Sequence, residues 1–196
     1  MQDVSVQLYT AADLWALSHC PEYAGKRLEL REGVLIEMSP AGGLHGQIAS
    51  RLDRLIGAFV EAHRLGAATA AETGYVLCAH PEGRDTVRAP DVGFLAAGRL
   101  PEGMPDGCIP FAPDLAVEAI SPNDEAEAVQ QRVLDYLRFG TRQVSVVYPR
   151  ARSVVVYTPE GSAQTFGADD TLDGGTVLPG LRIPLRTVFS PGGRTP

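Results

Sequence analysis

The sequence predicts a single α/β domain with a mixed, largely antiparallel sheet flanked by two principal helices. Its length of 196 residues suits one domain and is enough to bury a core. Two long segments carry apolar residues at helical spacing, and several short apolar runs bounded by turn residues are typical of strands. Because no repeat, low-complexity tract or linker divides the chain, we expect residues 1–196 to form one domain, with a core at about 8–189.

The first predicted elements are a short helix and a hairpin. Thr10 is a candidate N-cap for a helix over 10–17, since an acid three residues later resembles a capping box. The apolar segments 27–30 and 34–38 flank a short turn that contains Gly33, which predicts a tight hairpin.

A long amphipathic helix is predicted between about Leu44 and Leu65, and Gly66 would end it. A strand over 74–78 follows, and Pro- and Gly-rich loops enclose a further strand near Asp91. The apolar residues of the helix are Ile48, Leu52, Leu55, Ile56, Phe59 and Val60, and the two loops cover 79–88 and 97–112.

The second half of the chain contains the other principal helix. A cap, a proline and early acids at 121–125 predict a helix over 124–139 that stops at Gly140. Strands are expected at 144–148 and 154–158, with two short ones near Thr165 and Val177. The buried stripe of the helix is Val129, Arg132, Val133, Tyr136 and Leu137, which follow the spacing of one helical face.

Composition and charge limit which binding partners and which cellular compartment we expect for this protein. A net charge of −7 argues against a tight non-specific nucleic-acid binder, whose affinity comes from neutralising phosphates. The negative charge is still compatible with a nuclease, because an acidic site attracts phosphate once a metal ion is bound there. No run of 18 apolar residues and no signal-peptide profile at residues 1–4 is present, so membranes are not indicated. Three dispersed cysteines without a Cys-x-x-Cys pair fit a reduced cytoplasm.

Two short apolar strands each carry a carboxylate, Asp91 in one and Glu118 in the other. Alternation places Glu118 on the same face as Ala116 and Ile120, in a strand that otherwise reads as core on both faces. A buried anion is costly unless a cation compensates it. Two carboxylates on neighbouring strands are suitable ligands for a hard divalent ion such as Mg²⁺. The residues therefore predict a metal-dependent phosphodiesterase.

Arg132 supplies a candidate cation, because it lies on or beside the apolar face of the second helix. Its stem could lie along the edge of the core while the guanidinium reaches solvent. Alternatively, the guanidinium could meet the carboxylates, or a phosphate that they help to bind, through bidentate hydrogen bonds.

An ordered set of short motifs extends from about Leu8 to Phe189. The motifs are Leu28-Glu29-Leu30 with Gly33, Met38-Ser39-Pro40 followed by His45, Pro90-Asp91-Val92, the run 113–122, Arg132-Val133-Leu134-Asp135-Tyr136 with Gly140, and Leu178-Pro179-Gly180. Together they resemble the Uma-type (Uma-two) restriction endonuclease family, a branch of the PD-(D/E)XK nuclease superfamily. The resemblance implies a restriction-endonuclease-like fold, DNA as the partner and a homodimer.

The resemblance also assigns roles by position. Asp91 matches the acid of the family's "PD", and Glu118 matches the acid of its second strand. Glu29 matches the acid of the first hairpin, an auxiliary or second-metal ligand. An ion pair of Glu29 with neighbouring arginines of its own strand is the alternative. His45 could approach the metal site or the scissile phosphate, or it could be an ordinary histidine at a helix start.

The chain departs from the family pattern at the lysine. The superfamily places it two residues after the second acid, where this chain has Ile120, and the Uma-type branch places it where this chain has Arg132. Arginine keeps its proton, so Arg132 can orient water or stabilise charge but cannot act as a general base. Activation of the attacking water would then fall to the metal.

The leading hypothesis is a Mg²⁺- or Mn²⁺-dependent endonuclease that hydrolyses DNA, with Asp91 and Glu118 as ligands, Glu29 as a supporting ligand, and Arg132 and His45 as further catalytic candidates. The missing lysine supports the alternative of a catalytically weakened or inactive module that binds nucleic acid or protein. The acidic charge also allows a metal-dependent hydrolase of a smaller phosphoester. Tyr136, Gln131 and His45 are the next positions to test if Arg132 points away from the acids.

Overall fold

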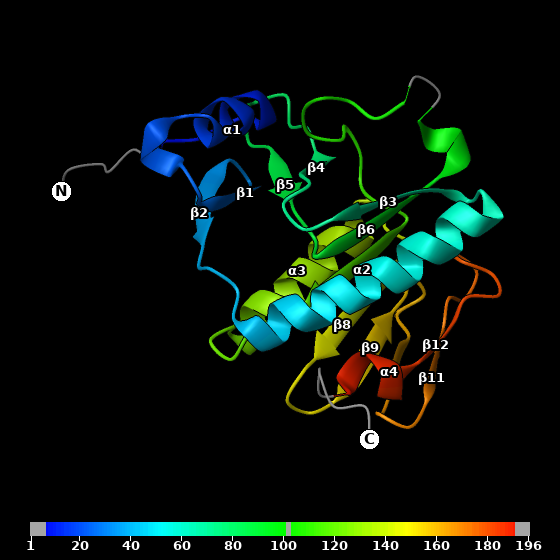
Figure 1. Ribbon diagram of the computed structural model, residues 1–196. Coiled ribbons are helices and arrows are strands. Elements are labelled where there is room, and N and C mark those ends of the chain that lie inside the picture. Colours follow the sequence, from blue (N-terminus) through cyan, green and yellow to red (C-terminus); the bar gives the residue numbers. More distant parts are fainter. Residues whose placement is uncertain (1–6, 101–102, 191–196) are drawn as a thin grey trace.

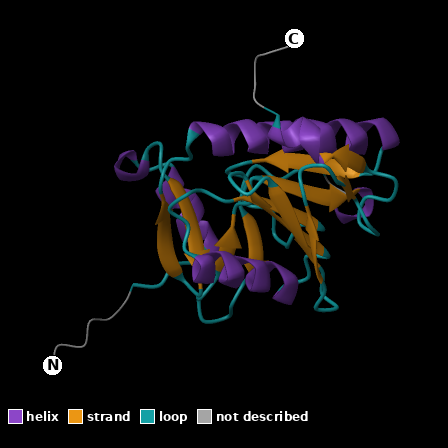
Figure 2. Ribbon diagram, turned by 90° about the horizontal axis from the view of Figure 1, so that it is seen from below, coloured by secondary structure: helices purple, strands orange, loops and turns teal. Residues whose placement is uncertain are grey.

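A six-stranded sheet with a long helix on each face forms the body of the molecule (Figures 1 and 2). The computed structural model describes residues 7–100 and 103–190, so the expected absence of a signal peptide at residues 1–4 concerns positions outside them. The strand order is β10-β9-β8-β7-β6-β3, and within this sheet only β7 and β8 are parallel. The strands are β3 (Gly66–Ala70), β6 (Val92–Ala96), β7 (Leu115–Ala119), β8 (Gln143–Tyr148), β9 (Ser153–Tyr157) and β10 (Ala163–Phe166).

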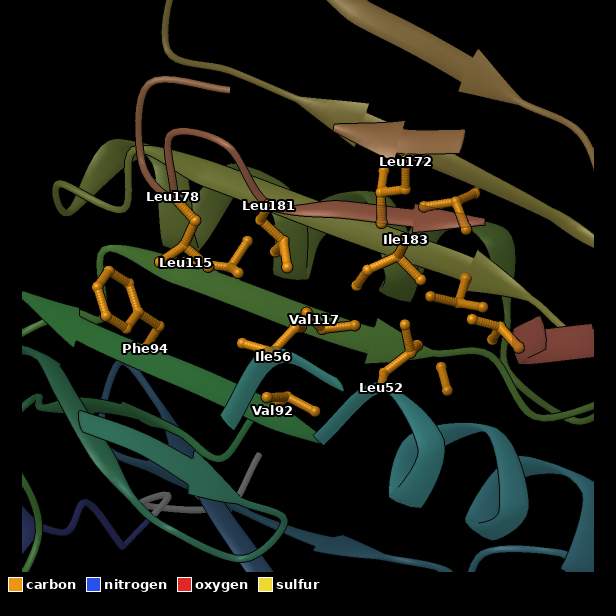
Figure 3. Close-up of a cluster of buried hydrophobic side chains, with 14 of the residues drawn as sticks. Leu52, Ile56, Val92, Phe94, Leu115, Val117, Leu172, Leu178, Leu181 and Ile183 are labelled. Carbon is orange, nitrogen blue, oxygen red and sulfur yellow. The ribbon is translucent and has the colours of Figure 1, made fainter. Parts of the chain in front are cut away.

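The two principal helices are α2 (Gly43–His63) and α3 (Ala126–Arg138). Residues Leu115, Val117 and Ala119 of β7 face a core cluster that contains the apolar side of α2. Figure 3 shows part of this cluster, with Ile56 of α2 beside Val92 of β6 and Val117 of β7. Ala116 of the same strand packs instead with α3. The predicted alternation along β7 is therefore confirmed, and it leaves Glu118 on the side of α3.

A four-stranded antiparallel sheet, in the order β2-β1-β5-β4, lies beside the larger one. The hairpin is confirmed, and its turn residues Glu32 and Gly33 both have positive φ, as a two-residue type I′ turn requires. Thr10 forms the predicted capping box. The elements of this part are α1 (Ala11–Ser18), the 3₁₀ helix η1 (Pro21–Tyr23), β1 (Arg27–Arg31), β2 (Val34–Met38), β4 (Tyr75–Cys78) and β5 (Thr86–Arg88).

Several local predictions are wrong. The long helix ends at His63 and is capped by Arg64, which adopts the left-handed conformation, and Gly66 instead begins β3. The region 79–88 contains β5, because residues 86–88 pair with strands on both sides. Val177 lies in a turn between two short strands rather than in one. The second predicted loop contains the 3₁₀ helix η2 (Ala97–Arg99), and residues 101–102 of this loop lie outside the described part. The remaining elements are β11 (Thr171–Asp173), β12 (Arg182–Pro184) and α4 (Leu185–Phe189).

The link between the two larger sheets positions the candidate site. Strand β5 of the smaller sheet ends at Arg88, and β6 of the larger sheet begins at Val92. Only Ala89, Pro90 and Asp91 separate them, so Asp91 lies where the two sheets meet. Among the described residues, no helix is both long and apolar enough to cross a membrane.

Candidate active site

Three buried carboxylates lie at the junction of the two sheets. Glu29 comes from β1, Asp91 from the link before β6, and Glu118 from β7. Their exposed fractions are 1%, 3% and 7%. The β6–β7 register pairs Val92 with Val117, and its next position would place Asp91 opposite Glu118. These acids therefore come together from segments far apart in the sequence.

Glu118 is held by two residues of α3. The Tyr136 hydroxyl donates to Glu118 Oε1 at 2.8 Å, and Arg132 Nη1 donates to the same oxygen at 3.3 Å. Burial raises the pKa of Glu118 to about 7, the anions of Asp91 and Glu29 add to the rise, and the Arg132 charge and the Tyr136 hydrogen bond oppose it. Glu118 is thus an acid whose charge the site compensates only in part.

Arg132 connects Glu118 to Glu29. Its Nη1 donates to Glu29 Oε1 at 2.8 Å, and the side chain is 15% exposed. Arg132 and Tyr136 are four residues apart on α3, which puts them on the same helical face. The guanidinium points into the site, so the alternative in which it reaches solvent is wrong.

Both carboxylate oxygens of Glu29 accept hydrogen bonds. Its Oε1 also accepts from the Ala89 backbone N–H at 3.0 Å, and its Oε2 accepts from Arg88 Nη1 at 2.9 Å. Burial alone would raise the pKa of Glu29, but the charges of Arg132 and Arg88 and the Ala89 hydrogen bond hold it below its usual value. The ion pairs therefore form with distant arginines, not with those of its own strand.

Asp91 has a different set of partners. Its Oδ2 accepts from the Ala119 backbone N–H at 2.8 Å, and its Oδ1 lies 3.0 Å from His45 Nε2 and 3.7 Å from Arg27 Nη2. The hydrogen bond to Asp91 raises the pKa of His45, although burial opposes the rise. The other ring nitrogen, Nδ1, lies 3.3 Å from Ser121 Oγ. His45, in the first turn of α2, thus has both ring nitrogens turned to the site.

Four participants were missed by sequence reasoning. Arg88 and Asp135 form a buried ion pair behind Glu29, while Arg27 and Ser121 contact Asp91 and His45. Asp135 belongs to the motif around Arg132, and Arg88 directly precedes the Asp91 link, so proximity in sequence was the available signal. Their long-range partners carried no such signal.

A cavity borders the site at Asp91. Its volume is about 570 Å³, and it is lined by Asp91, His45 and Arg27, together with the loop before α2. Within the described part of the chain, no three His, Cys, Asp or Glu side chains are grouped as a ready metal site. The site therefore consists of two adjoining groups of side chains. Glu29, Glu118 and Arg132 form one group, and Asp91, His45 and Arg27 form the other.

Comparison with known proteins agrees with this architecture. Residues 13–186 match the Uma2 family, which is described as "Putative restriction endonuclease". The structure is similar to the crystal structure of "a putative nuclease belonging to DUF820" from Anabaena variabilis, with a TM-score of 0.74 and 24% sequence identity, covering 92% of this chain and 97% of that one. At that identity the likeness shows the fold. A search of curated proteins found no match.

Proposed function

Because this chain belongs to the Uma2 family, we propose that it is a nuclease that hydrolyses phosphodiester bonds in DNA with Mg²⁺ or Mn²⁺. The observation that carries the proposal is the register of β6 and β7, whose next position puts Asp91 opposite Glu118, with Arg132 joining Glu118 to Glu29 and with Asp91 lining a cavity. Phosphoryl-transfer sites use carboxylates of this kind to hold a metal against the substrate phosphate.

The residues fit a divalent cation chemically. Carboxylate oxygens are the ligands that Mg²⁺ and Mn²⁺ prefer. Both hydrogen bonds to Glu118 go to Oε1, and Oε2 accepts none from the described residues. The raised pKa of Glu118 also indicates that additional positive charge would be favourable at this point. Asp91 and Glu118 would hold the ion, with Glu29 in support. When bound, the ion would polarise the phosphate and acidify a water molecule.

The protein's own residues have distinct roles in this proposal. Arg132 orients Glu118 and Glu29 and offers a fixed positive charge to the phosphate. Tyr136 keeps Glu118 in place from behind. His45, whose pKa is raised by Asp91, carries a proton more readily than an ordinary histidine and holds it beside the cavity. Arg132 does not remove a proton from water, because a guanidinium stays charged.

One observation favours the alternative of a non-catalytic module. Arg132 Nη1 already contacts both Glu29 and Glu118, so it partly supplies the positive charge that a metal would bring. A site neutralised in this way could serve nucleic-acid or protein binding without hydrolysis. A hydrolase of a smaller phosphoester would share the same acids.

A nuclease assay tests the proposal. Purified protein is incubated with single- and double-stranded DNA in Mg²⁺, in Mn²⁺ and in excess EDTA. We expect cleavage in the metal buffers, none in EDTA, and loss of cleavage in Asp91→Asn. Asp114→Asn is the matched control, because Asp114 is a buried, ion-paired acid outside the site, with Arg99 as its partner. Equal cleavage by Asp91→Asn and wild type would contradict the proposal, and a metal-dependent hydrolysis confined to small phosphoesters would favour the third reading.

The family resemblance also leads us to propose a homodimer that acts in the cytoplasm, with the chain folded as a single domain. Sedimentation velocity at several protein concentrations tests the dimer. A single species with the mass of one chain, 20.9 kDa, at all concentrations would exclude it.

A further inference from the structure

A second cavity, of about 330 Å³, adjoins the candidate site on the side of α1. Trp15 of α1 and His19, the residue directly after that helix, contribute to its lining, and so do Lys26 and Arg27 at the start of β1. Glu29 also contributes to its lining, so this cavity reaches the same carboxylate that Arg132 contacts. Its volume lies at the lower end of the range for small-ligand pockets, about 300 to 1,000 Å³.

Trp15 is unusually exposed for its size. It is 44% exposed, although tryptophan is normally highly buried. The His19 ring packs against it edge to face, with ring centroids 4.6 Å apart at an angle of 65°, and His19 Nδ1 lies 2.7 Å from the Trp15 carbonyl oxygen. The indole is therefore held by its neighbour while it remains accessible. A fixed, accessible aromatic surface is what a planar ligand needs for stacking.

The two cavities share part of their lining. Gly25, Lys26, Arg27 and Glu72 line both of them. Arg27 Nη2 lies 3.7 Å from Asp91 Oδ1, which lines the first cavity, and Trp15 lines the second. A chain-like ligand with its reacting group at Asp91 would thus pass two cations before it reaches the indole.

We propose that the cavity beside Trp15 binds an unpaired nucleobase of a single-stranded DNA substrate, stacked on the indole, while Lys26 and Arg27 contact the adjacent phosphates. This inference rests on the proposed nuclease function and names its preferred substrate. Stacking accepts any base, because every base has a π-face, and it is unavailable to bases paired inside a duplex. Glu72 lines both cavities, and Glu37, which lines the first, pairs with Lys26 at 2.9 Å. Stacking therefore contributes more here than phosphate neutralisation does.

Trp15 is the single tryptophan of the chain, so its fluorescence reports on this cavity alone. Wild-type protein in EDTA is titrated with oligothymidylate of ten nucleotides, with an abasic strand of the same length, and with a duplex. We expect quenching by the thymidylate strand, and little by the abasic strand or the duplex. Equal quenching by the abasic strand would overturn the inference, because the phosphates alone would then account for it.

Affinities are measured in parallel by anisotropy of a labelled thymidylate strand. Trp15→Ala should raise the dissociation constant by about 5- to 150-fold, the range for loss of one stacked base. Trp15→Phe should retain most of the affinity, because it keeps an aromatic face. Leu134→Ala is the matched control, since Leu134 is 49% exposed and lines a different cavity. Equal affinities for wild type and Trp15→Ala would overturn the inference.

Cleavage assays separate this inference from the proposed function. Metal-dependent cleavage without any change in Trp15 fluorescence would overturn the stacking subsite and leave the nuclease intact. Quenching by the thymidylate strand that Trp15→Ala weakens, without cleavage in any metal, would support the subsite and remove the nuclease activity.

Discussion

Arg132 and Glu29, which lie 103 positions apart in the sequence, are joined by a hydrogen bond of 2.8 Å. The contact links α3, which packs on the larger sheet, to β1 of the smaller sheet. Because the Arg132 nitrogen also contacts Glu118, one guanidinium connects acids from both sheets. The stability of this junction and the chemistry of the site are therefore coupled, and the following predictions separate the two.

Metal binding should stabilise the folded protein. At about a hundred times its dissociation constant, Mg²⁺ or Mn²⁺ should add about 2.7 kcal/mol to the free energy of unfolding, because the ion binds only the folded state. For a chain of this length, that is roughly 5 to 11 °C in melting temperature, measured by differential scanning fluorimetry. Asp91→Asn should remain folded without metal and lose the shift. An unchanged shift in this variant would exclude Asp91 as a ligand.

Arg132→Ala should impair the site in two measurable ways. It removes the charge that lowers the pKa of Glu118, so that pKa should rise further. It should also lower the cleavage rate by roughly 10² to 10³, the usual range for one lost transition-state donor. Arg132→Lys keeps the charge and should preserve most of the activity. If the wild type and both variants are inactive in either metal, the non-catalytic module is the better description.

Glu118 should make the metal-free protein less stable at and above neutral pH than at pH 4. Its pKa is about 7 in the folded state and 4.5 ordinarily, so the folded protein keeps a proton that the unfolded chain has released between these values. Stability is therefore lost as pH rises from about 4.5 to 7, by on the order of 3 kcal/mol. Glu118→Gln cannot ionise, so it should be more stable than wild type at pH 8 and similar at pH 4.

Urea unfolding at several pH values measures this difference. Comparing wild type with Glu118→Gln removes contributions from His45, whose raised pKa also favours the folded state at low pH. A stability difference that does not change between pH 4 and pH 8 would show that Glu118 titrates at its ordinary value in the folded protein.

Arg88 should be a structural residue of the junction. It forms ion pairs with Glu29 and Asp135, and all three side chains are buried. Arg88→Met would leave the buried Asp135 without its cation and Glu29 with Arg132 alone, which should cost about 3 to 5 kcal/mol of unfolding free energy. Arg84→Met is the matched control, because Arg84 pairs with Glu82 in solvent and should contribute less than about 1 kcal/mol. Chemical denaturation of both variants measures the two losses of unfolding free energy. Equal losses would contradict a structural role for Arg88.

Local patterns predicted most of the elements that carry the site. The capping box at Thr10, the hairpin around Gly33 and the alternation at Glu118 depend on residues within a few positions of one another, and all three are confirmed. The errors have the same origin. Strand β5 is three residues long and gains its hydrogen bonds from β1 and β4, so its own sequence gives little periodicity. Arg64 ends α2 by adopting a left-handed conformation that no local rule requires of arginine.

The sequence by itself determined that Glu118 lies on one face of a buried strand, that Arg132 and Tyr136 share a helical face, and which family the motifs resemble. Only the tertiary structure decided which residues contact these side chains. Arg132 pairs with Glu29 as well as Glu118, Arg88 joins Glu29 to Asp135, and Asp91 binds His45 and the Ala119 backbone. The reason is physical, because periodicity specifies the face of a side chain within its own element. Which distant charges meet there depends on how two sheets and two helices pack, and on the need of each buried carboxylate for a partner.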